Sequence, residues 1–294
     1  MGYTSYSVSN RSTRAESSGY FSKKVDEVFE QNKKKVIHES MNPVNAKLRE
    51  CRDSETHPNS LPIILALDVT GSMLEVPFHL IKDGLPNIMG KFVQSGLQDA
   101  SLLFLAIGDT VYDSYPLQVG QFESGDKELD TWLTRTYLEG GGGGNFGESY
   151  LLAWYFASKH IITDAFEKRK QKGFLFTIGD EPSLDSLPSN VIQEIIEENP
   201  QVSYDDKTLL KMAQEKYNVY HLHVLEGTAG TRSLSYWKKL LGQNCIEITN
   251  HQDIPKILTQ IVLDNYQKTS DKQVLETKKQ DEGNKNDEET ETIL

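Results

Sequence analysis

One acidic and two hydroxyl side chains follow a short apolar run in the first quarter of this chain. The run Ile63–Leu67 is unbroken, which is typical of a strand buried on both faces of a parallel sheet. Asp68, Thr70 and Ser72 come directly after it, each separated by one residue. Ligands bind at the carboxyl ends of strands in open α/β sheets, so a turn here can aim these oxygens at one small volume. Such an all-oxygen set suits Mg²⁺, and the alternative is that these residues only cap a helix.

Two later segments also carry side chains with oxygen ligands, each next to an expected strand or helix. Asp180 follows the strand expected at Phe174–Ile178 and can close the same site. Five glycines, 140–144, precede Asn145 and Glu148 before an expected helix, and glycine lets backbone approach a ligand closely. Either Asn145 or Glu148 can meet the ion directly, meet it through water, or cap the helix. The sequence therefore predicts a metal site made of Asp68, Thr70, Ser72, Asn145, Glu148 and Asp180.

Nucleotide binding is disfavoured at the glycine run. No Lys-Ser or Lys-Thr follows it, so the lysine that reaches phosphates in a P-loop is missing. A dinucleotide fingerprint would stand directly after a strand, whereas a helix, 127–135, is expected before these glycines.

The segment Asp68-Val-Thr70-Gly-Ser72 resembles the first loop of von Willebrand factor A (vWA) domains, whose metal-ion-dependent adhesion site (MIDAS) starts Asp-x-Ser-x-Ser. Thr70 replaces the first Ser and keeps the hydroxyl. The glycine loop departs from the family because it lacks the usual Thr. Residues 142–148 instead resemble the GGGDxPE variant of alpha-kinase-like vWA domains, with Asn145 in place of the acid, and residues 178–182 resemble its GDAPP form. The chain also looks similar to uncharacterised vWA proteins of bacteria and phages.

The resemblance spans roughly residues 61–266, and its implications are expectations. It implies a Rossmann-like, doubly wound fold and a bound Mg²⁺ or Mn²⁺ ion. It also implies a protein partner whose Asp or Glu fills the open coordination position. The expected function is then metal-dependent protein binding, as an adhesion or scaffold module, and not catalysis. Two alternatives stay open: a vWA scaffold without a functional metal site, and a metal-dependent hydrolase.

Apolar runs and helical patterns alternate along the middle of the chain. This alternation predicts an α/β fold with a mostly parallel, six-stranded sheet covered by helices on both sides. The expected strands are 63–67, 101–107, 115–122, 174–178, 219–225 and 245–248. The expected helices are 77–95, 127–135, 149–170, 190–198, 206–217, 233–241 and 254–266.

The two ends of the chain lie outside this pattern. Residues 1–60 are expected to form an N-terminal arm, extended over 1–20 and helical over 22–39. The apolar stripe of that helix includes Val25, Val28 and Phe29, and it either packs on the domain, 61–266, or mediates self-association. Residues 267–294 have no aromatic residue and little apolar content, which predicts a disordered acidic tail.

Composition limits the classes of partner and compartment. The 294 residues carry a net charge of −12 without a long basic run, which argues against nucleic acid and anionic membranes as partners. Cys51 and Cys245 lie far apart and suggest a reducing compartment. No apolar run approaches the roughly 20 residues that span a bilayer, and the N-terminus lacks a signal core. We expect a soluble, cytoplasmic protein.

Three further residues can do chemistry. Asp109 follows the strand 101–107 and can support the predicted site from the same sheet edge. His221 and His223 share one face of the strand expected at 219–225. A Zn²⁺ site would need more His or Cys nearby, so the pair is interpreted as core or supporting histidines.

Overall fold

The computed structural model describes residues 4–20, 22–141, 147–226 and 228–267. Its central sheet has six strands in the order β10-β9-β6-β2-β3-β4. All neighbouring strands are parallel except β4, which is antiparallel to β3 at one edge. The predicted α/β class with a mostly parallel six-stranded sheet is therefore confirmed. The strands are β2 (Leu61–Asp68), β3 (Ala100–Ile107), β4 (Leu117–Val119), β6 (Gly173–Gly179), β9 (Tyr217–Val224) and β10 (Cys245–Ile248).

The central strand β2 is buried at every one of its positions. Ile63, Leu65 and Leu67 point into one hydrophobic core, whereas Ile64 and Ala66 point into the other. Because successive side chains of a strand face opposite sides, a continuous apolar run of this kind can only be satisfied by helices on both faces of the sheet.

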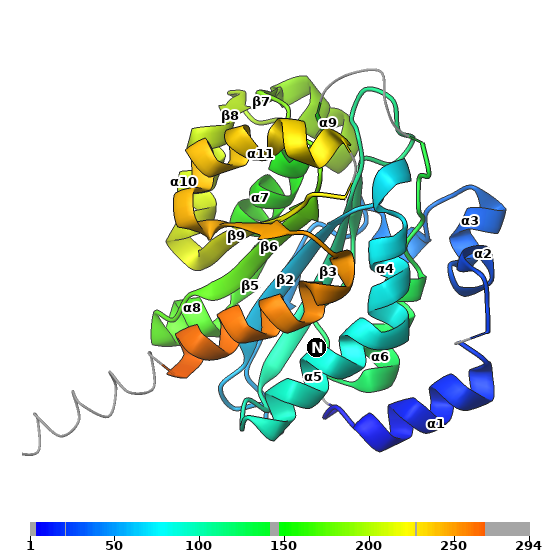
Figure 1. The fold of residues 1–294 in the computed structure, drawn as a ribbon. Helices are drawn as coiled ribbons and strands as arrows, with labels where there is room; N and C mark the ends of the chain where they lie inside the picture. The colour runs from blue at the N-terminus through cyan, green and yellow to red at the C-terminus, as the bar shows by residue number, and fades with distance from the viewer. Residues whose placement is uncertain (1–3, 21, 142–146, 227, 268–294) are drawn as a thin grey trace, which may run out of the picture.

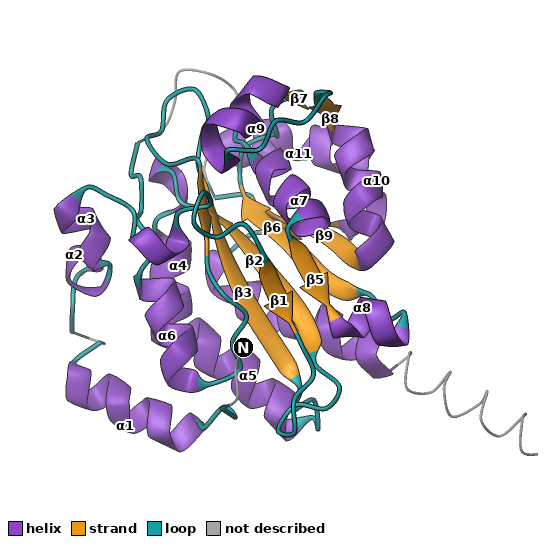
Figure 2. Cartoon of the chain, turned by 180° about the vertical axis from the view of Figure 1, so that it is seen from behind, coloured by secondary structure: helices purple, strands orange, loops and turns teal. Residues whose placement is uncertain are grey.

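Helices cover both faces, as Figures 1 and 2 show from opposite sides. The first core contains residues of α4 (Glu75–His79), α5 (Leu85–Gln94), α6 (Asp126–Thr134) and a helix that begins at Ile254 and continues to residue 267. A π-helical turn, Leu80–Gly84, joins α4 to α5. The second core contains residues of α7 (Tyr150–Lys159), α9 (Ser189–Ile196), α10 (Asp206–Lys216) and α11 (Thr228–Leu241). The fold is thus doubly wound.

The N-terminal arm differs from the expected arrangement. Residues 8–18 form a helix, α1 (Val8–Ser18), where an extended segment was expected. The Ser7 side chain caps its first turn by accepting a hydrogen bond from the backbone N–H of Asn10, and Gly19 ends the helix with φ +68°. These are ordinary helix start and stop signals. Helix α1 lies alongside α5 and α6 (Figure 1).

The helix expected over 22–39 is also wrong, because it divides into α2 (Val25–Val28) and α3 (Glu30–Lys34). Phe29 interrupts it with a non-helical backbone, φ −97° and ψ 83°. Its side chain is fully buried in the first core. Burial of this aromatic ring outweighs the loss of helix continuity. The apolar stripe packs on its own domain in this structure.

A second expected helix, 149–170, is interrupted as well. The chain forms α7, then the short strand β5 (Ile161–Thr163), then α8 (Asp164–Arg169). Strand β5 pairs in parallel with β1 (Arg49–Cys51), outside the main sheet. The β-branched run Ile-Ile-Thr favours a strand, and the Thr163 side chain then caps α8. A further antiparallel pair joins β7 (Ser186–Leu187) to β8 (Tyr204–Asp205).

The predicted disordered tail lies outside the described residues, apart from Gln267, and stays a prediction, as do the domain boundaries at residues 60 and 266. In the part of the chain that the structure describes, no helix is both long and apolar enough to cross a membrane.

Candidate metal centre

Asp68 occupies the last position of β2 and is fully buried. Its Oδ1 accepts hydrogen bonds from the backbone N–H of Thr70 at 2.9 Å and from the Thr70 hydroxyl at 2.7 Å. The turn after β2 therefore folds back on the carboxylate, as the spacing of these residues predicts. This contact also fixes the direction in which the chain leaves the strand.

Tyr150 is the hydrogen-bond partner of the other carboxylate oxygen of Asp68, and no local sequence pattern indicates this role. Its hydroxyl donates a hydrogen bond of 2.7 Å to Asp68 Oδ2. The close approach requires Gly179 at the end of β6. A Cβ built on Gly179 would lie 1.8 Å from the Tyr150 hydroxyl and 2.9 Å from Asp68 Oδ2. Gly179 thus leaves the space in which Tyr150 reaches Asp68.

Ser72 and Asp180 connect the loop after β2 to the loop after β6. Leu67 pairs in register with Ile178, so both loops leave the sheet at the same edge. The Ser72 hydroxyl donates a hydrogen bond of 3.1 Å to Asp180 Oδ1. Asp180 is buried, whereas Ser72 is exposed. The structure thus brings into direct contact two residues that were predicted to share one site, while their binding of a metal stays a prediction.

The glycine loop reaches the same edge through its first described residues. The backbone N–H of Gly71 donates a hydrogen bond of 2.6 Å to the carbonyl of Gly141. A Cβ built on Gly71 would lie 3.0 Å from that carbonyl oxygen. The absence of a side chain on Gly71 therefore allows the two backbones to approach closely. Asn145 lies outside the described residues, and its predicted role stays a prediction.

Glu148 and Asp109 bring two further buried carboxylates to this edge. The backbone N–H of Glu148 donates a hydrogen bond to the carbonyl of Pro182, and that of Ser149 donates one to the carbonyl of Gly108. Among the described residues, Glu148 Oε2 and Asp109 Oδ2 have no hydrogen-bond partner although both are buried. Buried oxygens of this kind are costly without a partner, and either a proton or a cation would satisfy them.

Electrostatics at this edge disfavours three charged carboxylates. Burial raises the pKa of Asp68 to about 7, against hydrogen bonds from Thr70 and Tyr150 that lower it. Burial, and then repulsion from Asp68 and Asp109, raises the pKa of Glu148 to about 10. Burial also raises the pKa of Asp180, against the hydrogen bond from Ser72. A nearby cation would favour all three charged forms.

The donor set fits a hard divalent cation. Carboxylate and hydroxyl oxygens are the ligands of Mg²⁺ and Mn²⁺, and Glu148 Oε2 has no hydrogen-bond partner within the part of the chain that the structure describes. Across the described ranges, no three His, Cys, Asp or Glu side chains gather into a metal-binding group. An ion at this edge would therefore depend on the hydroxyls of Thr70 and Ser72 for part of its ligand shell.

The two histidines form a buried chain and not a pair facing an ion. His223 Nε2 lies 2.7 Å from the carbonyl of Gly230, which only accepts, so this nitrogen carries the proton. His223 Nδ1 then accepts from His221 Nε2 at 3.0 Å, and His221 Nδ1 accepts from the Thr177 hydroxyl at 2.9 Å. Burial lowers the pKa of both histidines. Both imidazoles are therefore neutral, and the interpretation as core histidines agrees with the structure.

Comparison with known proteins shows the fold. No family model and no curated protein matches the chain. Among solved structures, it is similar to the pilus adhesin SpaC from Lactobacillus rhamnosus GG in its open conformation, with a TM-score of 0.50 and 9% identity over 74% of this chain and 31% of SpaC. It also aligns with proximal thread matrix protein 1 from the mussel byssus, solved with a zinc-occupied MIDAS motif, at a TM-score of 0.45 and 10% identity over 73% of this chain and 48% of that protein.

The chain thus spans less than half the length of either of these proteins. At such identities the likeness concerns the fold alone. The SpaC alignment shows a shared fold over 74% of this chain, and separately the sequence around Asp68 resembles the first loop of vWA domains. The chain has a vWA-like fold.

Proposed function

We propose that this chain is a protein-binding module that holds a divalent cation, Mg²⁺ or Mn²⁺, at the edge formed by Asp68, Ser72 and Asp180. The observation that carries the proposal is the direct contact of Ser72 with Asp180, which joins two loops that are 108 residues apart in sequence. Asp68 and Thr70 stand beside it on the same loop, and Glu148 adds a carboxylate oxygen that has no hydrogen-bond partner among the described residues.

Each of these residues would have a distinct role in holding the ion. Ser72 and Thr70 offer hydroxyl oxygens, Asp180 and Glu148 offer carboxylates, and Tyr150 holds Asp68 in a fixed orientation. A bound ion would supply positive charge and an open coordination position. Because only hard oxygen groups surround that position, a hard oxygen ligand is favoured there. An Asp or Glu side chain of a protein partner provides such a ligand, and the net charge of −12 means that the ion must reverse the local sign.

Binding, and not catalysis, is the proposed role, and the cytoplasm is the proposed location. Cys51 and Cys245 are both buried and unpaired, which suits a reducing compartment. A protein partner is proposed in place of nucleic acid or a membrane, because the sequence has no long basic run.

Calorimetry with Mn²⁺ tests the metal. We expect Ser72→Ala to weaken Mn²⁺ binding at least about tenfold, as loss of even an outer-shell partner does. Ser72 is exposed, so its replacement should leave the fold intact. Ser95→Ala, an exposed serine at the end of α5, is the matched control. Equal affinities of Ser72→Ala and wild type would contradict the site.

A pull-down with and without EDTA tests the function. A partner retained in Mg²⁺ and lost in EDTA, and lost again in Asp180→Asn with Mg²⁺ present, supports the proposal. Replacing the partner's key acid by its amide should abolish capture. A partner that binds equally well in EDTA would refute the mechanism while leaving the fold untouched.

A further inference from the structure

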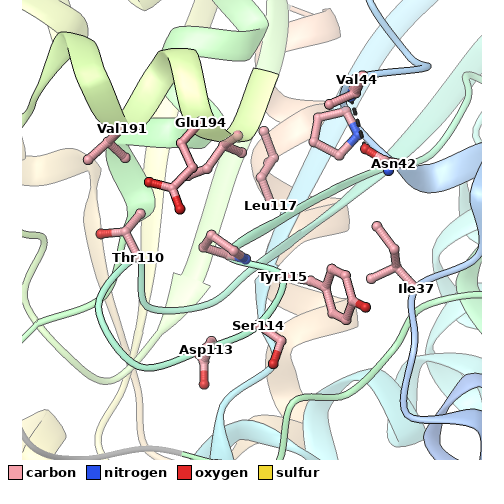
Figure 3. A pocket seen from close by; sticks show the side chains of 13 residues that line it. Ile37, Asn42, Val44, Thr110, Asp113, Ser114, Tyr115, Leu117, Val191 and Glu194 are labelled. Carbon is pink, nitrogen blue, oxygen red and sulfur yellow. Dashed lines mark hydrogen bonds between the residues drawn. The ribbon is translucent and has the colours of Figure 1, made fainter. Parts of the chain in front are cut away.

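A groove lies beside the candidate metal centre and is walled by three segments far apart in sequence. It has a volume of about 270 Å³. Residues 37–44 of the N-terminal arm form one wall, the loop 110–117 between β3 and β4 forms the second, and α9 forms the third (Figure 3). The arm, which lies outside the span of the vWA resemblance, thus contributes directly to this surface.

The groove combines acidic groups with apolar walls. Asp113 and Glu194 are its two charged lining residues, and neither forms an ion pair within the described part of the chain. Val44, Leu117 and Ile195 line it with apolar surface. No Lys or Arg is among the described lining residues. An occupant that carries positive charge at the end of an aliphatic stem would satisfy both features.

Short backbone contacts join the groove to the metal centre. The Asp113 carboxylate accepts a hydrogen bond of 2.8 Å from the backbone N–H of Asp109, which lies at the metal edge. The backbone N–H of Tyr115 donates one of 2.7 Å to Glu139 Oε1, just before the glycine loop that contacts Gly71. The loop 109–117 therefore joins the groove to the edge of the sheet where the centre lies.

The loop between these two sites also exposes apolar side chains. Val111 and Tyr112 are 64% and 57% exposed and lie between Asp109 and Asp113 in sequence. Exposed apolar groups beside polar ones are a common feature of protein-binding surfaces. They supply contact area on the path from the metal centre to the groove.

We infer that the groove binds a Lys or Arg side chain of the same partner whose Asp or Glu reaches the metal centre. This inference rests on the proposed function. The volume is below the range of about 300–1,000 Å³ that is usual for small-molecule sites, so one long side chain is a better fit than a drug-sized ligand. Glu194 pairs with the charge, Asp113 adds negative charge to the lining of the groove, and the apolar walls cover the stem.

Fluorescence anisotropy with short labelled peptides tests the inference. The peptides carry one Asp and one Arg in a Gly-Ser background, with the spacing between them varied, and each has a matched peptide with Gln in place of Arg. In Mg²⁺, at the best spacing, we expect the Arg peptide to bind about fivefold more tightly, the upper end of what exposed ion pairs contribute. The preference should disappear in Glu194→Gln. It should persist in Glu197→Gln, an exposed acid on the next turn of the chain that does not line the groove.

The outcomes separate the groove from the metal centre. EDTA-sensitive binding with no preference for Arg at any spacing overturns the groove and leaves the proposed function standing. A preference for Arg that Glu194→Gln does not reduce also overturns the groove. Arg-dependent binding that survives EDTA but is lost in Glu194→Gln supports the groove and overturns the metal mechanism. Absence of binding by every peptide in Mg²⁺ overturns both.

Discussion

The Tyr150 hydroxyl links the helix α7 to the acid at the end of β2. It donates a hydrogen bond of 2.7 Å to Asp68 Oδ2 from a fully buried position. Groups that orient a metal-binding carboxylate tune its affinity without touching the ion. Tyr150 is accordingly a positioning residue in the proposed mechanism.

Removal of that hydroxyl should weaken metal binding more than it weakens the fold. We expect Tyr150→Phe to lower Mn²⁺ affinity about tenfold, the lower end of the usual effect of outer-shell partners. Calorimetry measures this change, and urea denaturation measures stability. The matched control is Tyr217→Phe, because the Tyr217 hydroxyl is buried without a partner among the described residues. Unchanged affinity in Tyr150→Phe would show that Asp68 needs no such support.

A second prediction at this scale concerns the stability of the fold when Gly179 is replaced. Gly179→Ala places a Cβ 1.8 Å from the Tyr150 hydroxyl, so Tyr150 or β6 must move. We expect a loss of about 1–3 kcal/mol in the free energy of unfolding, as for other overpacked cores. Tyr150→Phe in the same chain should recover only part of it, since the ring carbon Cζ would still lie 2.7 Å away. Gly90→Ala, within α5 and 3.4 Å from its nearest neighbour, should instead be neutral or stabilising.

Among the elements, α8 is attached to the connector before β2 by several polar side chains, of which Asp164 makes contacts to both Arg52 and the backbone of Asp53. Asp164 accepts hydrogen bonds from Arg52 at 2.8 Å, from Lys168 at 2.6 Å and from the backbone N–H of Asp53 at 2.9 Å. Burial alone would raise the pKa of Asp164, but these hydrogen bonds outweigh it and lower the pKa to about 2. The ionised carboxylate therefore stabilises the folded state.

This attachment predicts a dependence of stability on acid. The folded pKa lies below the ordinary value of 3.8, so the stabilisation is present above about pH 4 and is lost as the pH falls towards 2. Asp164→Asn should lower the free energy of unfolding at pH 7 and flatten its decline over that window. Urea denaturation at a series of pH values measures both. Parallel curves for the variant and the wild type would contradict the assignment.

At the scale of the whole molecule, the N-terminal arm is joined to the domain by a buried guanidinium. Arg11 on α1 is 2% exposed and donates hydrogen bonds to the carbonyls of Ile81 and Lys82 in the π-helical turn. It also forms an ion pair with Asp130 on α6 at 3.4 Å. The arm thus donates hydrogen bonds to carbonyls of this turn, besides covering the first core with Phe29.

Loss of Arg11 should therefore loosen the arm from the domain. We expect Arg11→Met to cost about 1–3 kcal/mol of unfolding free energy, because buried carbonyls lose their donors. Hydrogen exchange should show faster exchange along α1. Arg14→Met should cost less, since the Arg14 side chain is 29% exposed in its ion pairs. Equal losses of unfolding free energy in the two variants, with α1 still protected from exchange, would contradict this role of Arg11.

Much of this architecture was predictable from sequence. The buried run of β2, the alternation of strands and helices, and the acids at strand ends all follow from local patterns. Parallel strands put their carboxyl ends at one edge, so local order was enough to bring Asp68, Ser72 and Asp180 together. The errors fell where tertiary packing overrides local periodicity, as at Phe29, whose burial breaks a helix, and at β5, whose partner β1 lies more than a hundred residues earlier.

Other contacts have no local sequence pattern that predicts them, and only the tertiary structure shows them. Tyr150 and Asp68 are 82 residues apart, and the need for glycine at position 179 appears only when the three are seen together. The groove likewise needs the arm, the β3–β4 loop and α9 side by side. Sequence periodicity reports which face of an element is buried, but not which distant side chain meets it there. The sequence thus determined the sheet and the edge where chemistry is possible, and packing determined which side chains orient that chemistry and what surface stands beside it.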